Sequence, residues 1–132
     1  MKVIFSHGQE SNPTGSKIMH LSDIARKHGF TTDSIDYQAI PDPDARVKHL
    51  LDILKKQKDY ILVGSSMGGY VSLVASGSVN SKGVFLLAPA LYMPGYGVQQ
   101  YPTNNQHLEI VHGWSDEVIP VEHSIRYAKE AD

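Results

Sequence analysis

Residues 60–69 read Tyr-Ile-Leu-Val-Gly-Ser-Ser-Met-Gly-Gly, an apolar run that leads directly into the pattern Gly64-x-Ser66-x-Gly68. Ile61–Val63 has the apolar character of a buried parallel strand, and Tyr70–Ala75 continues as a buried helix. A serine between such a strand and helix lies on a sharp turn that exposes its hydroxyl group. The flanking glycines are required because the strand and the helix pass close together. The pattern therefore predicts a nucleophilic Ser66 rather than a glycine-rich turn.

Size, charge and composition narrow the class of protein. A chain of 132 residues is expected to form one domain, and its net charge of −2 argues against nucleic acid or an anionic membrane as the main partner. The chain contains no cysteine, which excludes disulfides, a thiolate nucleophile and cysteine-ligated metal. No apolar segment is long enough to span a bilayer or to act as a signal peptide, so we expect a cytoplasmic protein.

Strand and helix patterns alternate along the whole chain. The expected strands contain Val3–Phe5, Ser34–Tyr37, Ile61–Val63, Val84–Leu87 and Leu108–Val111. The expected helices have apolar positions at Ile18, Leu21, Ile24, Ala25 and His28, at Val47, Leu50, Leu51 and Leu54, and at Val121, Ile125 and Ala128. Gly29 is expected to end the first helix, and Asp42 and Pro43 to begin the second. This alternation predicts a three-layer α/β/α domain with a parallel sheet of about five strands.

The last helical pattern continues to Asp132 without a glycine, a proline or another stop signal. We therefore expect residues 1–132 to form a single domain that is incomplete at its C-terminal end. The oligomeric state is not predicted.

A serine nucleophile requires a base, a group that orients the base, and donors for the oxyanion. Ser6–Gln9 directly follows the first strand, so the backbone N–H groups of Gln9 and Met67 are predicted to converge on the developing negative charge. The alternative is a tight turn before a helix that is capped by Ser11, Asn12 or Thr14.

An acidic residue follows the fifth strand. Asp116, with Glu117 as the second choice, is placed to orient a histidine at the carboxyl end of the sheet. The alternative is a turn aspartate or a solvated charge at a helix entry.

Four motifs together resemble the α/β-hydrolase superfamily, and particularly its small single-domain bacterial serine hydrolases. They are Phe5-Ser6-His7-Gly8, Gly64-Ser65-Ser66-Met67-Gly68-Gly69, Leu87-Ala88-Pro89-Ala90, and His112-Gly113 followed by Asp116, Val118 and Pro120. The resemblance covers nearly the whole chain. It implies that Ser66 is the nucleophile, that Asp116 is the triad acid and that the backbone after Gly8 belongs to the oxyanion hole. It also implies the strand order 2-1-3-4-5, which puts the site at a topological switch point.

The histidine of the family's triad is not evident. In the family it follows a further strand after the acid, and of the seven histidines only His123 follows Asp116. A base must contact both Ser66, after the third strand, and Asp116, after the fifth strand, and these strands are about 10 Å apart. His123 would lie on an outer helix, from which its side chain would hardly reach both. We therefore name His123 as a candidate base but expect the true base beyond Asp132.

The substrate side of the site is expected to include Gly8 and the segment between the fourth and fifth strands, where Tyr92, Met93 and Tyr96 would form an apolar wall. An ordinary surface loop is the alternative for that segment. Neither a Walker loop nor a dinucleotide fingerprint is present, so no cofactor or metal is expected.

The resulting functional hypothesis is a serine hydrolase that acts on small carboxylic esters or thioesters through an acyl-enzyme on Ser66. The alternatives are a non-catalytic α/β binding domain and an acyltransferase.

Overall fold

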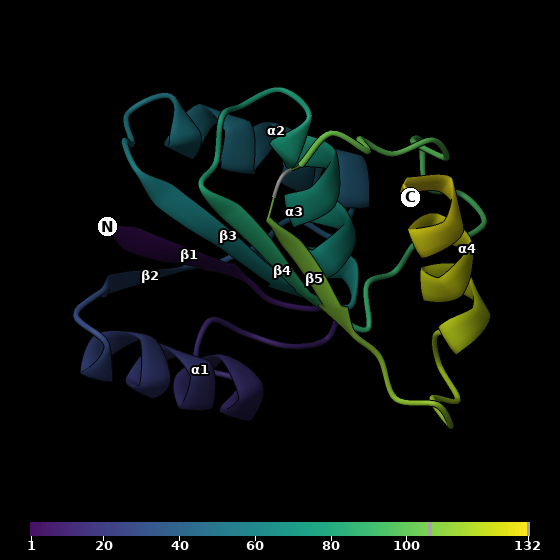
Figure 1. Ribbon diagram of the computed structural model, residues 1–132, viewed down its shortest axis with the longest axis horizontal. Coiled ribbons are helices and arrows are strands. Elements are labelled where there is room, and N and C mark those ends of the chain that lie inside the picture. Colours follow the sequence, from purple (N-terminus) through teal and green to yellow (C-terminus); the bar gives the residue numbers. More distant parts are fainter. Residues whose placement is uncertain (106, 132) are drawn as a thin grey trace.

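Five parallel strands form the central sheet of the computed structural model, which describes residues 1–105 and 107–131 (Figure 1). The strands are β1 (Lys2–Ser6), β2 (Thr31–Ile35), β3 (Tyr60–Ser65), β4 (Gly83–Leu87) and β5 (Leu108–Val111). They lie in the order β2-β1-β3-β4-β5, and every neighbouring pair is parallel. The predicted fold class and strand order are therefore confirmed.

The register of the sheet aligns the carboxyl ends of its central strands. Ser6 of β1 pairs with Gly64 of β3, Ser65 pairs with Leu87 of β4, and Leu87 pairs with Val111 of β5. The segments that follow these strands therefore emerge at one edge of the sheet. This edge is where ligands bind in open α/β sheets.

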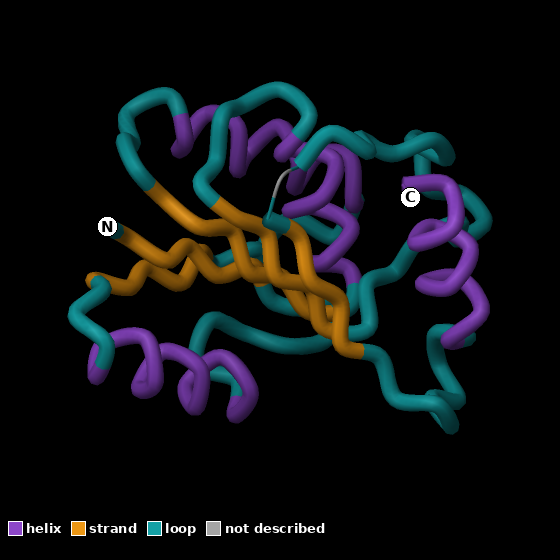
Figure 2. The backbone as a smooth tube through the Cα atoms, viewed as in Figure 1, coloured by secondary structure: helices purple, strands orange, loops and turns teal. Residues whose placement is uncertain are grey.

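In the described part of the chain, four helices complete the three layers. They are α1 (Ser16–Lys27), α2 (Pro43–Leu54), α3 (Met67–Ser76) and α4 (Val121–Ala131). In Figures 1 and 2, α1 lies alone on one side of the sheet, whereas α2 and α3 lie on the other. In the part of the chain that the structure describes, no helix has the length and apolar character needed to cross a membrane.

The apolar core is divided by the sheet into two clusters of different size, because successive side chains of a strand point to opposite faces. The larger cluster joins the sheet to α2 and α3 and includes Ile4, Leu50, Leu62, Tyr70, Leu73 and Leu86. The smaller cluster lies under α1 and has Val3, Phe5, Ile18 and Val63 as its buried members. The α1 layer is therefore held by fewer buried side chains than the opposite layer.

Two predicted helix boundaries are confirmed. The carboxylate of Asp42 accepts a hydrogen bond from the N–H of Ala45 and caps α2, and Pro43 is the first residue of that helix. Gly29 has a φ of 87° just beyond α1, a conformation that glycine adopts without steric cost.

The second strand begins and ends earlier in the chain than the sequence predicted. It spans Thr31–Ile35, so Asp36 and Tyr37 lie outside the strand that was expected to contain them. The reason is a turn: the carboxylate of Asp36 accepts the N–H of Gln38, and the N–H of Ile40 donates to the carbonyl of Tyr37.

The buried face of the last helix also differs from the prediction. In α4 the buried side chains are Val121, Ser124 and Tyr127, whereas Ala128 is exposed. The hydroxyl of Tyr127 donates to the carbonyl of Pro102, so a tyrosine rather than an alanine anchors the helix.

Candidate functional site

Ser66 forms the turn between β3 and α3 and has an unusual backbone conformation. Its φ is 57° and its ψ is −120°, a strained combination for a residue other than glycine. The loop after β4 holds this conformation from both sides, because the Ser66 N–H donates to Leu87 (3.0 Å) and its carbonyl accepts the N–H of Ala90 (2.9 Å). The Ser66 hydroxyl caps no backbone N–H group of α3.

The glycines around Ser66 allow the backbone segments to approach closely. A Cβ atom at Gly64 would lie 2.0 Å from the carbonyl oxygen of Gly68, and one at Gly68 would lie 2.0 Å from that of Ser6. Gly8 is also tight, since a Cβ atom there would lie 3.3 Å from the Ser66 Cβ. The loop after β1 therefore lies directly against the serine, as the neighbouring positions of β1 and β3 require.

A cavity of about 480 Å³ opens beside Ser66. This volume falls in the range of small-molecule sites. The residues that line it come from the loop after β1, the first turn of α1, the turn at Ser66 and the loop after β5: His7, Gly8, Gln9, Glu10, Ser11, Gly15, Ser16, Lys17, Ile18, Ser65, Ser66 and Val118. The cavity thus has both charged and apolar walls next to one hydroxyl group.

Two backbone N–H groups beside Ser66 are candidates for an oxyanion hole. Met67 is the first residue of α3, so its N–H has no partner within the helix and carries the partial positive charge of the helix N-terminus. The other candidate belongs to Gln9, which lines the cavity. Within residues 1–105 and 107–131, neither N–H donates in any loop, turn or cap hydrogen bond.

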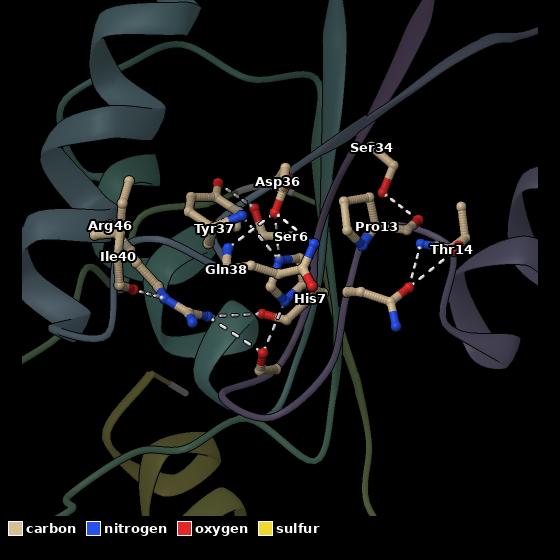
Figure 3. A network of polar contacts seen from close by, with 12 residues as sticks. Ser6, His7, Pro13, Thr14, Ser34, Asp36, Tyr37, Gln38, Ile40 and Arg46 are labelled. Carbon is tan, nitrogen blue, oxygen red and sulfur yellow. Dashed lines mark hydrogen bonds and ion pairs between the residues drawn. The ribbon is translucent and has the colours of Figure 1, made fainter.

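His7 is completely buried at the end of β1 and shapes the loop that follows. Its Nε2 accepts the N–H of Tyr37 (2.9 Å), so Nδ1 carries the proton and donates to the carbonyl of Gly8 (2.7 Å). Burial lowers the pKa of His7, against the raising effect of its hydrogen bond to Gly8. His7 is therefore neutral at physiological pH and holds the loop (Figure 3).

Asp116 lies in the loop after β5 and is held by that loop. Its Oδ1 accepts the N–H groups of Val118 and Ile119, both at 2.9 Å. These hydrogen bonds lower the pKa of Asp116 and keep it ionised at neutral pH. They are the contacts of a turn aspartate, the alternative that the sequence left open. The other oxygen, Oδ2, lies 3.5 Å from Nε2 of His112.

Among residues 1–105 and 107–131, no histidine is hydrogen-bonded to Ser66 so as to link it to Asp116. His112 is committed to the loop: its Nε2 donates to the carbonyl of Ile119 (2.8 Å), and its Nδ1 lies 2.7 Å from the hydroxyl of Ser124. The ring of His123 packs edge-on against Tyr92, and no hydrogen bond among the described residues joins His123 to Ser66 or Asp116. In the same part of the chain, no group of three or more His, Asp or Glu side chains is arranged to hold a metal ion.

Comparison with protein families gives a match over most of the chain. Residues 2–101 match the model of the uncharacterised protein family UPF0227. The chain belongs to this family. A comparison with curated proteins finds no significant match.

Solved structures share the fold. One is a protein of Xanthomonas campestris pv. campestris proposed to be a hydrolase of the alpha/beta superfamily, with 27% identity, a TM-score of 0.88, and coverage of 98% of this chain and 81% of that one. The ydeN gene product of B. subtilis has 16% identity, a TM-score of 0.84 and coverage of 99% and 81%. Est1E of Butyrivibrio proteoclasticus has 19% identity, a TM-score of 0.79 and coverage of 98% and 74%. The chain is thus similar to α/β hydrolases and has a reduced α/β-hydrolase fold.

Of the four residues predicted for the substrate side, one lines the cavity beside Ser66. Gly8 lines the cavity beside Ser66, but Tyr92, Met93 and Tyr96 do not. Tyr92 instead donates to Glu130 of α4 and packs against Tyr101, and Tyr96 packs against Tyr70 of α3. These aromatic rings attach the loop after β4 to α3 and α4. The loop is therefore part of the larger core cluster.

Two features of the site were not predicted from the sequence. They are the cavity wall formed by α1 and the buried side chain of Arg46. Ser16, Lys17 and Ile18 line the cavity because the first turn of α1 faces the carboxyl edge of the sheet. Arg46 is 1% exposed and reaches the loop after β1. A signal for Arg46 did exist, because it stands four residues before Leu50 on the predicted apolar face of its helix.

Proposed function

We propose that the protein is a serine hydrolase that cleaves small carboxylic esters or thioesters through an acyl-enzyme on Ser66. The observation that carries this proposal is the strained conformation of Ser66 in the wall of a cavity. A serine at φ 57° is costly unless the surrounding structure maintains it, and such strain concentrates at functional sites. The similarity to the Xanthomonas protein, a proposed hydrolase, supports the same class of reaction.

In the proposed reaction, the Ser66 Oγ attacks the substrate carbonyl carbon and its proton passes to a base. The N–H groups of Gln9 and Met67 bind the resulting alkoxide, a contribution of about 3–4 kcal/mol for each well-placed donor. Collapse of this intermediate breaks the C–O or C–S bond, and the leaving alcohol or thiol takes the proton. Water then repeats the sequence and releases the acid.

We propose that Asp116 is the acid that orients the base, and that the base is a histidine beyond Asp132. The pKa of Asp116 is held below its usual range, so its carboxylate is available to a histidinium. Among the residues that the structure describes, the hydrogen bonds to Asp116 go to its Oδ1, and its Oδ2 lies 3.5 Å from His112 Nε2.

The test of the nucleophile is covalent labelling of the full-length protein with a fluorophosphonate, in which Oγ displaces fluoride. We expect labelling in the wild type and none in Ser66→Ala. Ser65→Ala is the matched control, because Ser65 is the adjacent residue, lines the same cavity and should not affect labelling. Labelling that persists in Ser66→Ala would refute the assignment, and an unlabelled wild type would favour a binding domain.

The test of the base compares hydrolysis of short p-nitrophenyl esters by the 132-residue chain, its His123→Ala variant and a chain extended through the next strand. We expect weak hydrolysis by the first two and a large gain on extension. Robust activity of the 132-residue chain that disappears in His123→Ala would instead make His123 the base. An added alcohol or amine that captures the acyl group in preference to water would identify an acyltransferase.

A further inference from the structure

The carbonyl group of Gly8, in the loop after β1, has three hydrogen-bond donors around it. It accepts hydrogen bonds from His7 Nδ1 (2.7 Å), from Arg46 Nη1 (3.3 Å) and from the N–H of Ser11 (3.3 Å). A carbonyl oxygen has two lone pairs, so three donors exceed what it needs for satisfaction. The excess indicates that the direction of this peptide group matters.

Arg46 contributes to the same loop at several points. From α2 its guanidinium donates to the carbonyls of Ile40 (2.6 Å), His7 (3.3 Å), Gly8 (3.3 Å) and Gln9 (3.5 Å). Figure 3 shows its side chain reaching from the helix toward the segment that contains His7. The rigid fork of an arginine can hold several acceptors in fixed relative positions, which the single ammonium group of a lysine cannot.

The burial of Arg46 is costly and lacks the usual compensation. Its side chain is 1% exposed, yet it takes part in none of the ion pairs found among residues 1–105 and 107–131. A buried charge without a carboxylate partner is strongly unfavourable. Here the guanidinium faces carbonyl oxygens and the Tyr37 ring, with Tyr96 also nearby. If Arg46 served only to fill space, a neutral side chain of similar size could fill it without the free-energy cost of burying a charge.

The planar peptide bond links this clamp to the candidate oxyanion donor. The Gly8 carbonyl and the Gln9 N–H belong to the same trans peptide unit, so they point in opposite directions. Fixing the carbonyl toward Arg46 and His7 therefore fixes the direction of the Gln9 N–H. The guanidinium charge also polarises this peptide and makes the N–H a stronger donor.

From this arrangement we infer that Arg46 is the positioning residue of the oxyanion hole: with His7, it orients the Gly8–Gln9 peptide so that the Gln9 N–H stabilises negative charge formed at Ser66. This inference rests on the proposed function of Ser66. Arg46 does not line the cavity, so it acts through the peptide and not on the substrate.

The test measures the rate of fluorophosphonate labelling of the full-length protein as a function of reagent concentration, which separates the maximal rate constant from the apparent binding constant. The variants are Arg46→Met, Arg46→Lys and, as a matched control, Arg26→Met on the exposed surface of α1. The rate constant is obtained from the time course of labelling, and the amplitude from its end point. Protein that is permanently unfolded therefore lowers the amplitude but does not change the rate constant.

We expect the maximal rate constant of Arg46→Met to fall about 10- to 100-fold, with little change in the binding constant, because displacing an oxyanion donor affects the reaction step. Arg46→Lys should lie between it and the wild type, and Arg26→Met should match the wild type. A wild-type rate constant in Arg46→Met, even at reduced amplitude, would make Arg46 merely structural and overturn the inference while Ser66 stands. An unlabelled wild type would overturn the proposed function and this inference together.

Discussion

Two loops meet at the carboxyl edge of the sheet, and they are built in opposite ways. The loop after β1 begins at the fully buried His7 and is tied to α2 by Arg46. The loop after β5 carries Asp116 but also exposes Trp114 and Val118, which are 78% and 79% exposed. It is held by its own turn and by His112, which contacts α4.

The difference separates two tasks of the proposed reaction. The groups that would stabilise charge on the substrate carbonyl are fixed by the core of the domain. The carboxylate that would orient a base is fixed only by local hydrogen bonds. We therefore expect substitutions around β1 and β3 to reduce the stability of the whole protein. Substitutions in the loop after β5 should have small effects on stability, although replacing Asp116 should impair hydrolysis.

The largest difference should appear between Gly68, the second residue of α3, which packs against the end of β1, and Gly113 in the loop after β5. Gly68→Ala puts a Cβ atom 2.0 Å from the Ser6 carbonyl oxygen, so it should destabilise the protein by more than about 4 kcal/mol or prevent folding. Gly113→Ala meets nothing within 4 Å and should change stability by less than about 0.5 kcal/mol. Urea unfolding followed by circular dichroism measures both, and a well-folded Gly68→Ala variant would contradict the close approach at Ser66.

The second difference concerns pH. Burial lowers the pKa of His7 from its usual 6.5, so below that pH the folded protein binds fewer protons than the unfolded chain. Its contribution to stability is therefore complete above about pH 6.5 and is lost as the pH falls through the lowered pKa, with a slope of at most about 1.4 kcal/mol per pH unit.

This pH dependence can be assigned to one residue. His7→Gln should flatten the unfolding free energy between about pH 5 and 7, whereas His20→Gln, at an exposed position of α1, should leave the profile unchanged. The lowered pKa values of Asp36 and Asp116 act at lower pH, since both shift from 3.8. An unchanged slope in His7→Gln would show that another group is responsible.

A smaller effect is expected where the loop after β5 contacts α4. Ser124→Ala removes the hydroxyl that lies 2.7 Å from His112 Nδ1 and should cost about 1 kcal/mol of stability. The rate constant of Ser66 phosphonylation should not change, in contrast to Arg46→Met. If Ser124→Ala slowed phosphonylation as strongly as Arg46→Met, the two loops would not differ in the way we describe.

The smallest effect is expected at Trp114. Because its side chain is 78% exposed, Trp114→Ala should change the unfolding free energy by less than about 0.5 kcal/mol. A thermal denaturation curve checks this, and a clear loss of stability would indicate that the indole is covered in solution.

The fold was predictable because its signals are local. The apolar runs before Ser66 and around Phe85 identify buried strands. Asp42 and Pro43 identify a helix start, because the capping hydrogen bond joins Asp42 to a residue only three positions later. The position of Ser66 followed from steric requirements on Gly64 and Gly68, which the structure bears out. Such inferences need no knowledge of distant contacts.

The remainder of the site depends on distant contacts. Arg46 reaches Gly8 across 38 positions of sequence, and α1 becomes a cavity wall only because of where the sheet places it. Tyr92 and Tyr96 were assigned to a substrate wall by their chemistry alone, whereas packing against α4 and α3 decides their actual place. The roles of Ser66, Asp116 and His123 stay predictions until the labelling and hydrolysis experiments are done.

The unequal division of the core has a consequence for motion. Helix α1 is attached through the smaller cluster, and its first turn forms one wall of the cavity beside Ser66. We expect α1 to open locally at a lower free energy than α3, so that its amides exchange with solvent faster. The cavity would then widen whenever α1 opens locally. The largest substrate that the cavity accepts would be set by this local opening rather than by the cavity volume seen in the structure. Phosphonylation of Ser66 with a bulky reagent should accordingly slow exchange at Ser16–Ile18 more than in α3.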